Sequence, residues 1–168
     1  TYEYEKQRIV KTGPGSEITL GLNAYHADSS AAIFVDGRLI AATEEERFRR
    51  IKHWAGFPSE AIKFCLKEVG CSLADVSAIT IGRDPSAKKA NKAAFVLKYP
   101  LVAKALWSQR SANKDDILLL HEQFRLVETD VDVEMVKGKL RFIEHHRSHL
   151  GSAFFPSPFE EAAILSID

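Results

Sequence analysis

Two apolar runs, Ala31–Val35 and Arg38–Thr43, stand on either side of an Asp36-Gly37 pair. A two-residue type I′ turn needs a positive φ at both central positions, and Asp-Gly is among the pairs that best accept this conformation. Another short apolar run, Ile18–Leu22, precedes them. The sequence therefore predicts that three antiparallel strands open the folded part of the chain.

The next apolar segment has the spacing of a helix. Pro58-Ser59 suits the start of this helix, and Gly70 suits its end. The residues that recur at i, i+3, i+4 and i+7 are Ile62, Cys65, Leu66 and Val69. The later pattern predicts a strand over 76–81, helices over 86–107 (kinked or split at Pro100) and 113–127, a strand over 140–144, a short helix through Phe154 and a strand over 162–167. This order is an α/β pattern, a hairpin-led mixed sheet with helices, and it matches a ribonuclease-H-like unit.

The chain is expected to have three parts. Residues 1–15 form a polar extension, residues 16–161 the first ribonuclease-H-like subdomain, and residues 162–168 the first strand of a second, mostly absent subdomain. Because the chain ends on Asp168, a candidate metal ligand, we expect it to be a piece of a larger protein.

Charge and composition narrow the function classes. The 23 Lys and Arg residues equal the 23 Asp and Glu residues in number, so no overall positive field favours nucleic acid or an anionic membrane. No apolar run approaches the roughly 20 residues of a membrane span. The first 16 residues lack the apolar core of a signal peptide, which favours a cytoplasmic location.

A histidine-rich segment predicts a metal site. His145 and His149 are four residues apart in a predicted helix, so their imidazoles share one face. With Asp168 they form a two-histidine, one-carboxylate set, which favours iron and also suits zinc. His146 points about 100° away and is interpreted as a substrate contact. In the alternative interpretation, one histidine caps the helix, the other faces solvent, and Asp168 is an ordinary strand end.

Polar residues after the first strand predict a second part of the site. His26 lies near Asn23, Asp28 and two serines, Ser29 and Ser30. A histidine in such a turn can act as a general base or bind an anionic substrate, and the serines can cradle a phosphate. Alternatively, Asp28 and the serines only close the turn.

The connection over residues 44–56 is strongly charged, with three glutamates followed by a basic run that includes Lys52. Such runs are usually a solvated surface. The alternative is that Lys52 and its neighbours orient a ligand that carries a phosphate or carbamoyl group.

Three stretches, taken together, resemble the N-terminal part of the O-carbamoyltransferase family, which includes nodulation-factor and antibiotic carbamoyltransferases. They are Leu20–Ala32 with the Asp36-Gly37 hairpin, Glu44–His53 with Gly56–Pro58, and His145–Phe154 with Ser157–Phe159. The resemblance implies half of an actin-like or sugar-kinase-like fold, similar to the metal domain of threonylcarbamoyl-transfer enzymes. It also implies that carbamoyl phosphate and ATP form carbamoyl-adenylate, whose carbamoyl group then passes to an acceptor hydroxyl.

The resemblance also implies roles for individual residues. His145, His149 and Asp168 would be metal ligands, with a fourth ligand in the missing half. His26 would act in transfer, and Lys52 would lie near the carbamoyl or phosphate group. From their positions in the sequence, Asn23 and His146 are further candidates for substrate binding. The expected partners are a small hydroxyl acceptor, the missing C-terminal half and the adenylate-forming domain of the same protein. The fragment alone is expected to be inactive.

Other functions are compatible with parts of this pattern. A tRNA threonylcarbamoyl-transfer relative would need a basic face, which the neutral charge balance disfavours. A non-enzymatic metal- or nucleotide-binding module could use the same fold without His26 and Lys52. A ferrous oxygenase fits the metal ligands, but the α/β order opposes it.

Overall fold

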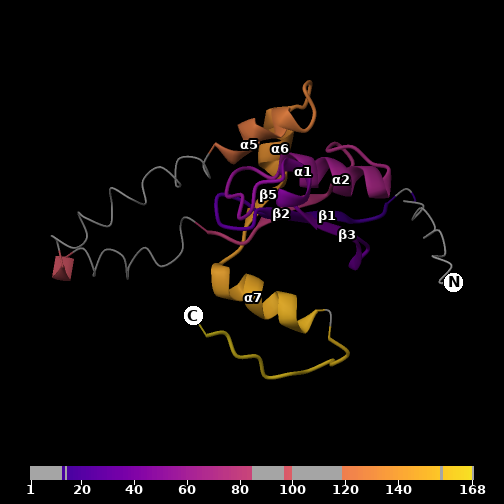
Figure 1. Cartoon of the computed structure of the whole chain (residues 1–168). Coiled ribbons are helices and arrows are strands. Elements are labelled where there is room, and N and C mark those ends of the chain that lie inside the picture. The colour runs from indigo at the N-terminus through magenta and orange to yellow at the C-terminus, as the bar shows by residue number, and fades with distance from the viewer. Residues whose placement is uncertain (1–12, 14, 85–96, 100–118, 156, 168) are drawn as a thin grey trace, which may run out of the picture.

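The computed structural model describes residues 13, 15–84, 97–99, 119–155 and 157–167. Their strands form one mixed sheet of order β3-β2-β1-β4-β5 (Figure 1). The strands are β1 Ile18–Asn23, β2 Ser30–Val35, β3 Arg38–Glu44, β4 Ala78–Ile81 and β5 Leu140–Phe142. Strand β2 is antiparallel to β1 and β3, while β4 is parallel to both β1 and β5. The predicted α/β class and the three opening strands are confirmed.

The β2–β3 hairpin has the turn that its residues predict. Asp36 and Gly37 have φ values of 50° and 76°, and Val35 pairs with Arg38 across the turn. Asp36 accepts a 2.8 Å hydrogen bond from the Glu17 N–H through Oδ1, so the turn is also tied to the start of β1. The hairpin therefore fixes the register of the first three strands.

One face of the sheet carries the core. Along β1 and β2, buried and half-buried residues alternate, as expected for a sheet covered mainly on one side. Helix α2, Ser59–Val69, packs on the buried face and ends at Gly70 with a φ of 75°, as predicted. The buried residues of the sheet and of α2 are Ile18, Leu20, Leu22, Ala31, Ile33, Val35, Ile79, Ile81, Ala61, Ile62, Cys65, Leu66 and Val69.

The segment before β5 adds further helices on the same side (Figure 1). They are α5 Leu120–Gln123, the 3-10 turn η1 Phe124–Leu126 and α6 Val133–Lys139. Phe124 is fully buried, and its ring packs edge-on against the Phe57 ring with 5.1 Å between the ring centroids. The end of the helix predicted over 113–127 is thus helical. Its first part and most of the helix predicted over 86–107 lie outside the described residues.

A buried carboxylate organises the charged connection after β3. Glu45 precedes the one-turn helix α1, Glu46–Arg49, and its side chain is fully buried. It accepts hydrogen bonds from the N–H groups of Glu60 at 3.2 Å and Ala61 at 2.8 Å. Its Oε1 also pairs with Arg49 Nε at 2.7 Å. Glu45 therefore caps α2 from a distant part of the chain, whereas the sequence suggested only a solvated surface or a ligand contact here.

Helix α7, His145–Phe154, lies on the other side of the sheet, as Figure 1 shows. Its extent confirms the helix predicted through Phe154. Residues 162–167 differ from the prediction: they are extended but have no strand pairing with the described residues, and a strand exists only as part of a ladder. The proposed division of the chain after residue 161 stays a prediction.

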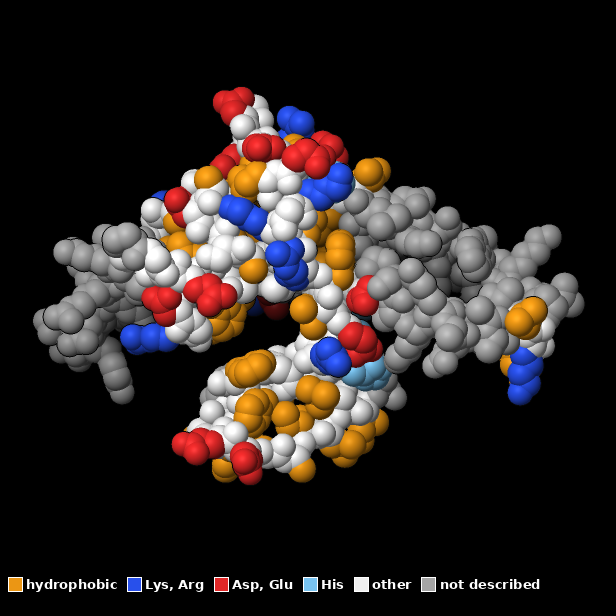
Figure 2. Space-filling view, turned by 180° about the vertical axis from the view of Figure 1, so that it is seen from behind, with side chains coloured by type: hydrophobic (Ala, Val, Ile, Leu, Met, Phe, Trp, Pro, Cys, Tyr) orange, Lys and Arg blue, Asp and Glu red, His pale blue; other side chains and the backbone are white. Residues whose placement is uncertain are grey.

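Apolar side chains gather on the surface formed by α7 and the segment after it (Figure 2). Phe155, Phe159, Leu165 and Ile167 are strongly exposed. This part of the chain thus contributes little to the core. Among the described residues, no helix has both the length and the apolar character needed to cross a membrane.

The capping role of Glu45 predicts a large loss of stability in the Glu45→Ala variant. The change removes the acceptor of two helix N–H groups and the ion-pair partner of Arg49, whose side chain is one-third exposed, and leaving such groups without their acceptor costs roughly 1–3 kcal/mol. Urea unfolding followed by circular dichroism measures the difference. Glu44→Ala is the matched control, because Glu44 makes only an exposed 3.3 Å pair with Arg47, worth about 1 kcal/mol or less. Equal losses in the two variants would contradict the capping role.

Candidate functional site

The carboxyl ends of three strands meet at one edge of the sheet. Leu22 of β1 pairs with Ile81 of β4, and Ile81 pairs with Phe142 of β5. From β1 the chain continues to β2 on one side, whereas β4 lies on the other side. In open α/β sheets such a reversal of strand order leaves a crevice at the carboxyl ends, where ligands bind.

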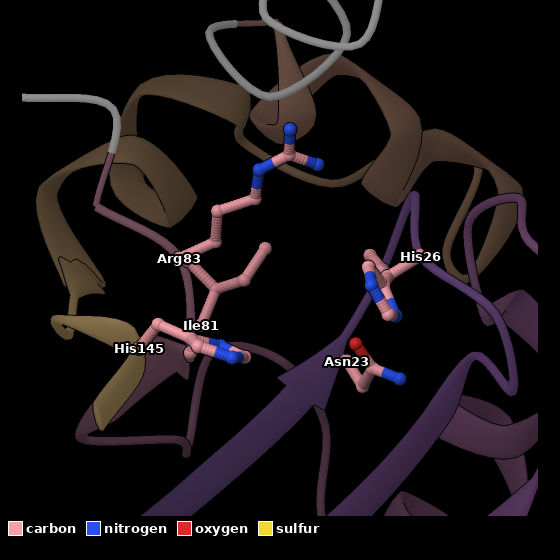
Figure 3. Close-up of a pocket in the computed structure, with 7 residues that line it drawn as sticks. Asn23, His26, Ile81, Arg83 and His145 are labelled. Carbon is pink, nitrogen blue, oxygen red and sulfur yellow. The ribbon is translucent and has the colours of Figure 1, made fainter. Parts of the chain in front are cut away.

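A pocket of about 290 Å³ occupies this position. The segments that follow β1, β4 and β5 all contribute to it. Its lining residues are Asn23, Ala24, His26, Ile81, Gly82, Arg83 and His145. Figure 3 shows Asn23 and His26 on one side, across from Ile81 and His145, with Arg83 rising from the same side as Ile81. The structure thus brings three predicted site residues, Asn23, His26 and His145, to one cavity.

The turn after β1 is shaped by its own polar groups. The Asn23 amide donates hydrogen bonds to the carbonyl oxygens of Ala27 at 3.1 Å and Asp28 at 3.0 Å. Tyr25 and Asp28 adopt left-handed conformations, with φ values of 56° and 63°. Such a φ is uncommon for a bulky residue such as Tyr, and strained backbone of this kind clusters at functional sites. The result is a tight turn with His26 exposed near its tip.

The same turn is fastened to the loop before α2. The Ser29 N–H donates to the Trp54 carbonyl at 2.9 Å, and its hydroxyl donates to the Gly56 carbonyl at 2.7 Å. The His53 ring lies 2.8 Å from an Asp28 carboxylate oxygen, and this hydrogen bond and charge raise the pKa of His53. Ser29 is buried and Asp28 is engaged in this way, so both hold the turn in place.

The N-terminus of α7 places His145 at the pocket. Glu144 caps the helix by accepting a hydrogen bond from the Arg147 N–H at 3.1 Å. Gly82, at the exit of β4, lets α7 approach, because a Cβ at this position would lie 3.0 Å from the Ser148 hydroxyl oxygen. A side chain at residue 82 would therefore require the Ser148 side chain to shift by a few tenths of an ångström.

The two predicted imidazole ligands converge. The Nε2 atoms of His145 and His149 are 3.1 Å apart, and both side chains are exposed. Two imidazole nitrogens bound to one ion at ~2.1 Å, with an angle of about 90–110° between them, are roughly 3.0–3.4 Å apart. The pair therefore fits two ligands of one metal ion, although the same distance also suits a hydrogen bond between the rings.

The described residues do not complete a metal site. They contain no group of three or more His, Cys, Asp or Glu side chains that could hold an ion. The predicted third ligand, Asp168, lies outside the described residues. The histidine pair is thus compatible with a metal and needs at least one further ligand to bind it tightly.

Two other predicted site residues lie elsewhere. Lys52 is exposed and does not line the pocket. His146 does not line it either, and its Nδ1 lies 3.3 Å from the Ser166 hydroxyl oxygen. Their roles toward substrate stay predictions.

Arg83 lines the pocket, and the sequence analysis did not select it. It is half-buried, and its Nη1 donates a 3.3 Å hydrogen bond to the Tyr25 carbonyl oxygen. A signal was present, since the residue follows Gly82 directly after a predicted strand, where α/β proteins place site residues.

The chain also resembles known proteins. Residues 18–168 match the family model described as the carbamoyltransferase N-terminus. An uncharacterized protein of Synechocystis, sll1178, is 39% identical over 152 residues, which cover 89% of this chain and 25% of that protein. The nodulation protein NolNO of Sinorhizobium fredii is 35% identical over 146 residues, which cover 87% of this chain and 20% of that protein.

The match to the family model extends over most of the sequence, from β1 through the pocket segments to the last residue. The chain spans a quarter or less of the length of these two relatives. It therefore belongs to the carbamoyltransferase family and corresponds to the N-terminal domain of its members.

Proposed function

We propose that this chain is the N-terminal part of an enzyme that transfers a carbamoyl group from carbamoyl phosphate to an acceptor hydroxyl. The donor is first activated with ATP to carbamoyl-adenylate in another domain of the same protein. The observation that carries the proposal is the shared pocket of His26 and His145 in a chain of the carbamoyltransferase family. The order of the mixed sheet, led by a hairpin, supports a ribonuclease-H-like half of an actin-like fold.

The transfer step needs a base and an electrophilic carbamoyl carbon. The acceptor oxygen attacks this carbon, its proton passes to a His26 ring nitrogen, and the bond from the carbamoyl carbon to the phosphoryl oxygen breaks. AMP leaves with the bonding electron pair, and a carbamate ester remains. His26 suits the role of base because it is exposed on the pocket wall and is held by a rigid turn.

A divalent metal, iron or zinc, would be held by His145, His149 and Asp168, with a further ligand from the rest of the protein. When bound, it would polarise the carbamoyl carbonyl and stabilise the negative charge that develops on its oxygen. The 3.1 Å approach of the two Nε2 atoms supports this assignment. Asn23 would orient the substrate from the opposite wall. Lys52 and His146 lie outside the pocket. They would contact the substrate only if they moved when it binds, or if the substrate extends beyond the pocket.

Pyrophosphate release in the full-length protein tests this function. We expect ATP to be converted to AMP and pyrophosphate only when carbamoyl phosphate is present, because the carbamoyl carboxylate formed from carbamoyl phosphate is the group that is adenylated. A coupled pyrophosphate assay with and without carbamoyl phosphate measures the dependence. Equal release without carbamoyl phosphate would reject the proposed reaction.

The His26→Gln variant of the full-length enzyme tests the base. We expect carbamate formation to fall roughly 100- to 10,000-fold, the usual contribution of a general base, while pyrophosphate formation continues. His53→Gln is the control for a purely supporting role, because His53 contacts the same turn through Asp28 but does not line the pocket, so it should change the rate only a few-fold. Normal transfer in His26→Gln at the pH optimum would exclude a catalytic role for His26.

A further inference from the structure

We propose that Arg83 binds the phosphoryl group of the carbamoyl donor and stabilises it as the leaving group. This inference rests on the proposed function and assigns a role to a residue of the same pocket. The shared chemistry is a phosphoryl group attached to the carbamoyl carbon, which is present in both carbamoyl-adenylate and carbamoyl phosphate.

The position of Arg83 gives it access to a ligand. It follows β4, next to the point where the strand order reverses, and it lines the pocket together with His26. One of its five N–H donors is used by the Tyr25 carbonyl. Among the residues that the structure describes, no carboxylate forms an ion pair with it. A fixed positive charge thus stands half-buried at a cavity with most of its donors available.

The charge of the pocket favours an anion. Among the described residues, its lining contains one guanidinium and two imidazoles and no acidic side chain, while the N–H groups of Asn23 donate within their own turn. His145 is the first residue of α7, so the N-terminal end of this helix, which carries the positive end of the helix dipole, also lies at the pocket. An anionic phosphoryl group would gain from the guanidinium and from the helix N-terminus.

The hydrogen bond to Tyr25 orients the guanidinium. Tyr25 adopts a left-handed φ of 56°, and its carbonyl accepts from Arg83 Nη1. The same turn carries His26 one residue later. Arg83 and the proposed base are therefore coupled through one rigid turn, which sets the spacing between the phosphoryl group and the attacking hydroxyl.

The chemistry gives this contact a catalytic consequence. As the acceptor oxygen bonds to the carbamoyl carbon, the bond from that carbon to the phosphoryl oxygen breaks and its electron pair goes to the phosphoryl oxygen. The charge on the leaving phosphate or AMP therefore increases during the step. A charged hydrogen bond from Arg83 strengthens as this charge grows, so it lowers the barrier as well as binding the donor.

The size of the pocket agrees with a small group. About 290 Å³ is at the low end of ligand pockets, so it suits a carbamoyl group with its phosphoryl group. The nucleoside of carbamoyl-adenylate would extend beyond it.

The test uses full-length protein with Arg83→Gln and Arg83→Lys, and with Arg38→Gln as the control, since Arg38 is exposed on the edge strand β3. Carbamate formation, pyrophosphate formation and the KM values for carbamoyl phosphate and acceptor are measured in each. We expect Arg83→Gln to slow carbamate formation roughly 10- to 100-fold, as the loss of a charged hydrogen bond implies. Lysine should restore part of the rate because it keeps the charge, and Arg38→Gln should behave as wild type.

The two donors give different patterns, and both support the role of Arg83. If carbamoyl-adenylate occupies the pocket, pyrophosphate formation stays normal and only transfer slows. If carbamoyl phosphate itself occupies it, the KM for carbamoyl phosphate in carbamate formation rises, while pyrophosphate formation in the other domain stays normal. Phosphonoacetamide, a stable analogue of carbamoyl phosphate, should then inhibit Arg83→Gln more weakly than the wild type.

Other outcomes would overturn the proposal. Wild-type transfer in Arg83→Gln would show that the residue does not contact the donor. In one such outcome, Arg83→Gln raises the KM for the acceptor as much as the KM for carbamoyl phosphate, Arg83→Lys restores no activity, and the melting temperature of the variant falls. This result would show that Arg83 only supports the turn. Absence of carbamate formation by the wild-type protein would instead reject the proposed function, so the two failures are distinguishable.

Discussion

The parallel pairing of β1 with β4 is the constraint on which the rest of the site depends. Leu22 and Ile81 are opposite each other at the carboxyl ends of these strands, and Phe142 of β5 continues the same row. The first turn, the segment with Arg83 and the N-terminus of α7 all begin at this row. A slip of one residue would turn the buried face of β4 toward solvent, so the register that protects the core also aligns the pocket.

Around this row, secondary contacts hold the pocket segments in place. The loop before α2 receives hydrogen bonds from Ser29, and α2 itself is capped by the buried Glu45. The run of charges after β3 therefore connects the hairpin, the helix and the turn that carries His26.

The sequence was sufficient for features with local causes. The Asp36-Gly37 turn, the apolar spacing of α2 and the Gly70 stop depend on neighbouring residues, so they could be predicted. The capping of α2 by Glu45 could not, because donor and acceptor are 15 or more residues apart and a run of glutamates is usually solvated. Helix α6 is absent from the predicted elements, although Asp132 accepts capping hydrogen bonds from the N–H groups of Glu134 and Met135. The segment over 162–167 has strand-like composition, but strand formation depends on a neighbouring strand that composition does not reveal.

For the site, histidine spacing predicted the converging imidazoles. The role of Arg83 depends on the strand order, which the sequence does not reveal.

Anomalous diffraction from crystals of the full-length protein, collected at the absorption edge of the metal that co-purifies with it, tests the central claim most directly. That claim is that the row of strand ends assembles the first turn and the α7 histidines into one reaction site. The account predicts a single strong peak about 2.1 Å from the Nε2 atoms of both His145 and His149, facing the cavity that His26 lines. A peak at another place in the protein, or a His26 turn on the far side of the sheet from the metal, would contradict it.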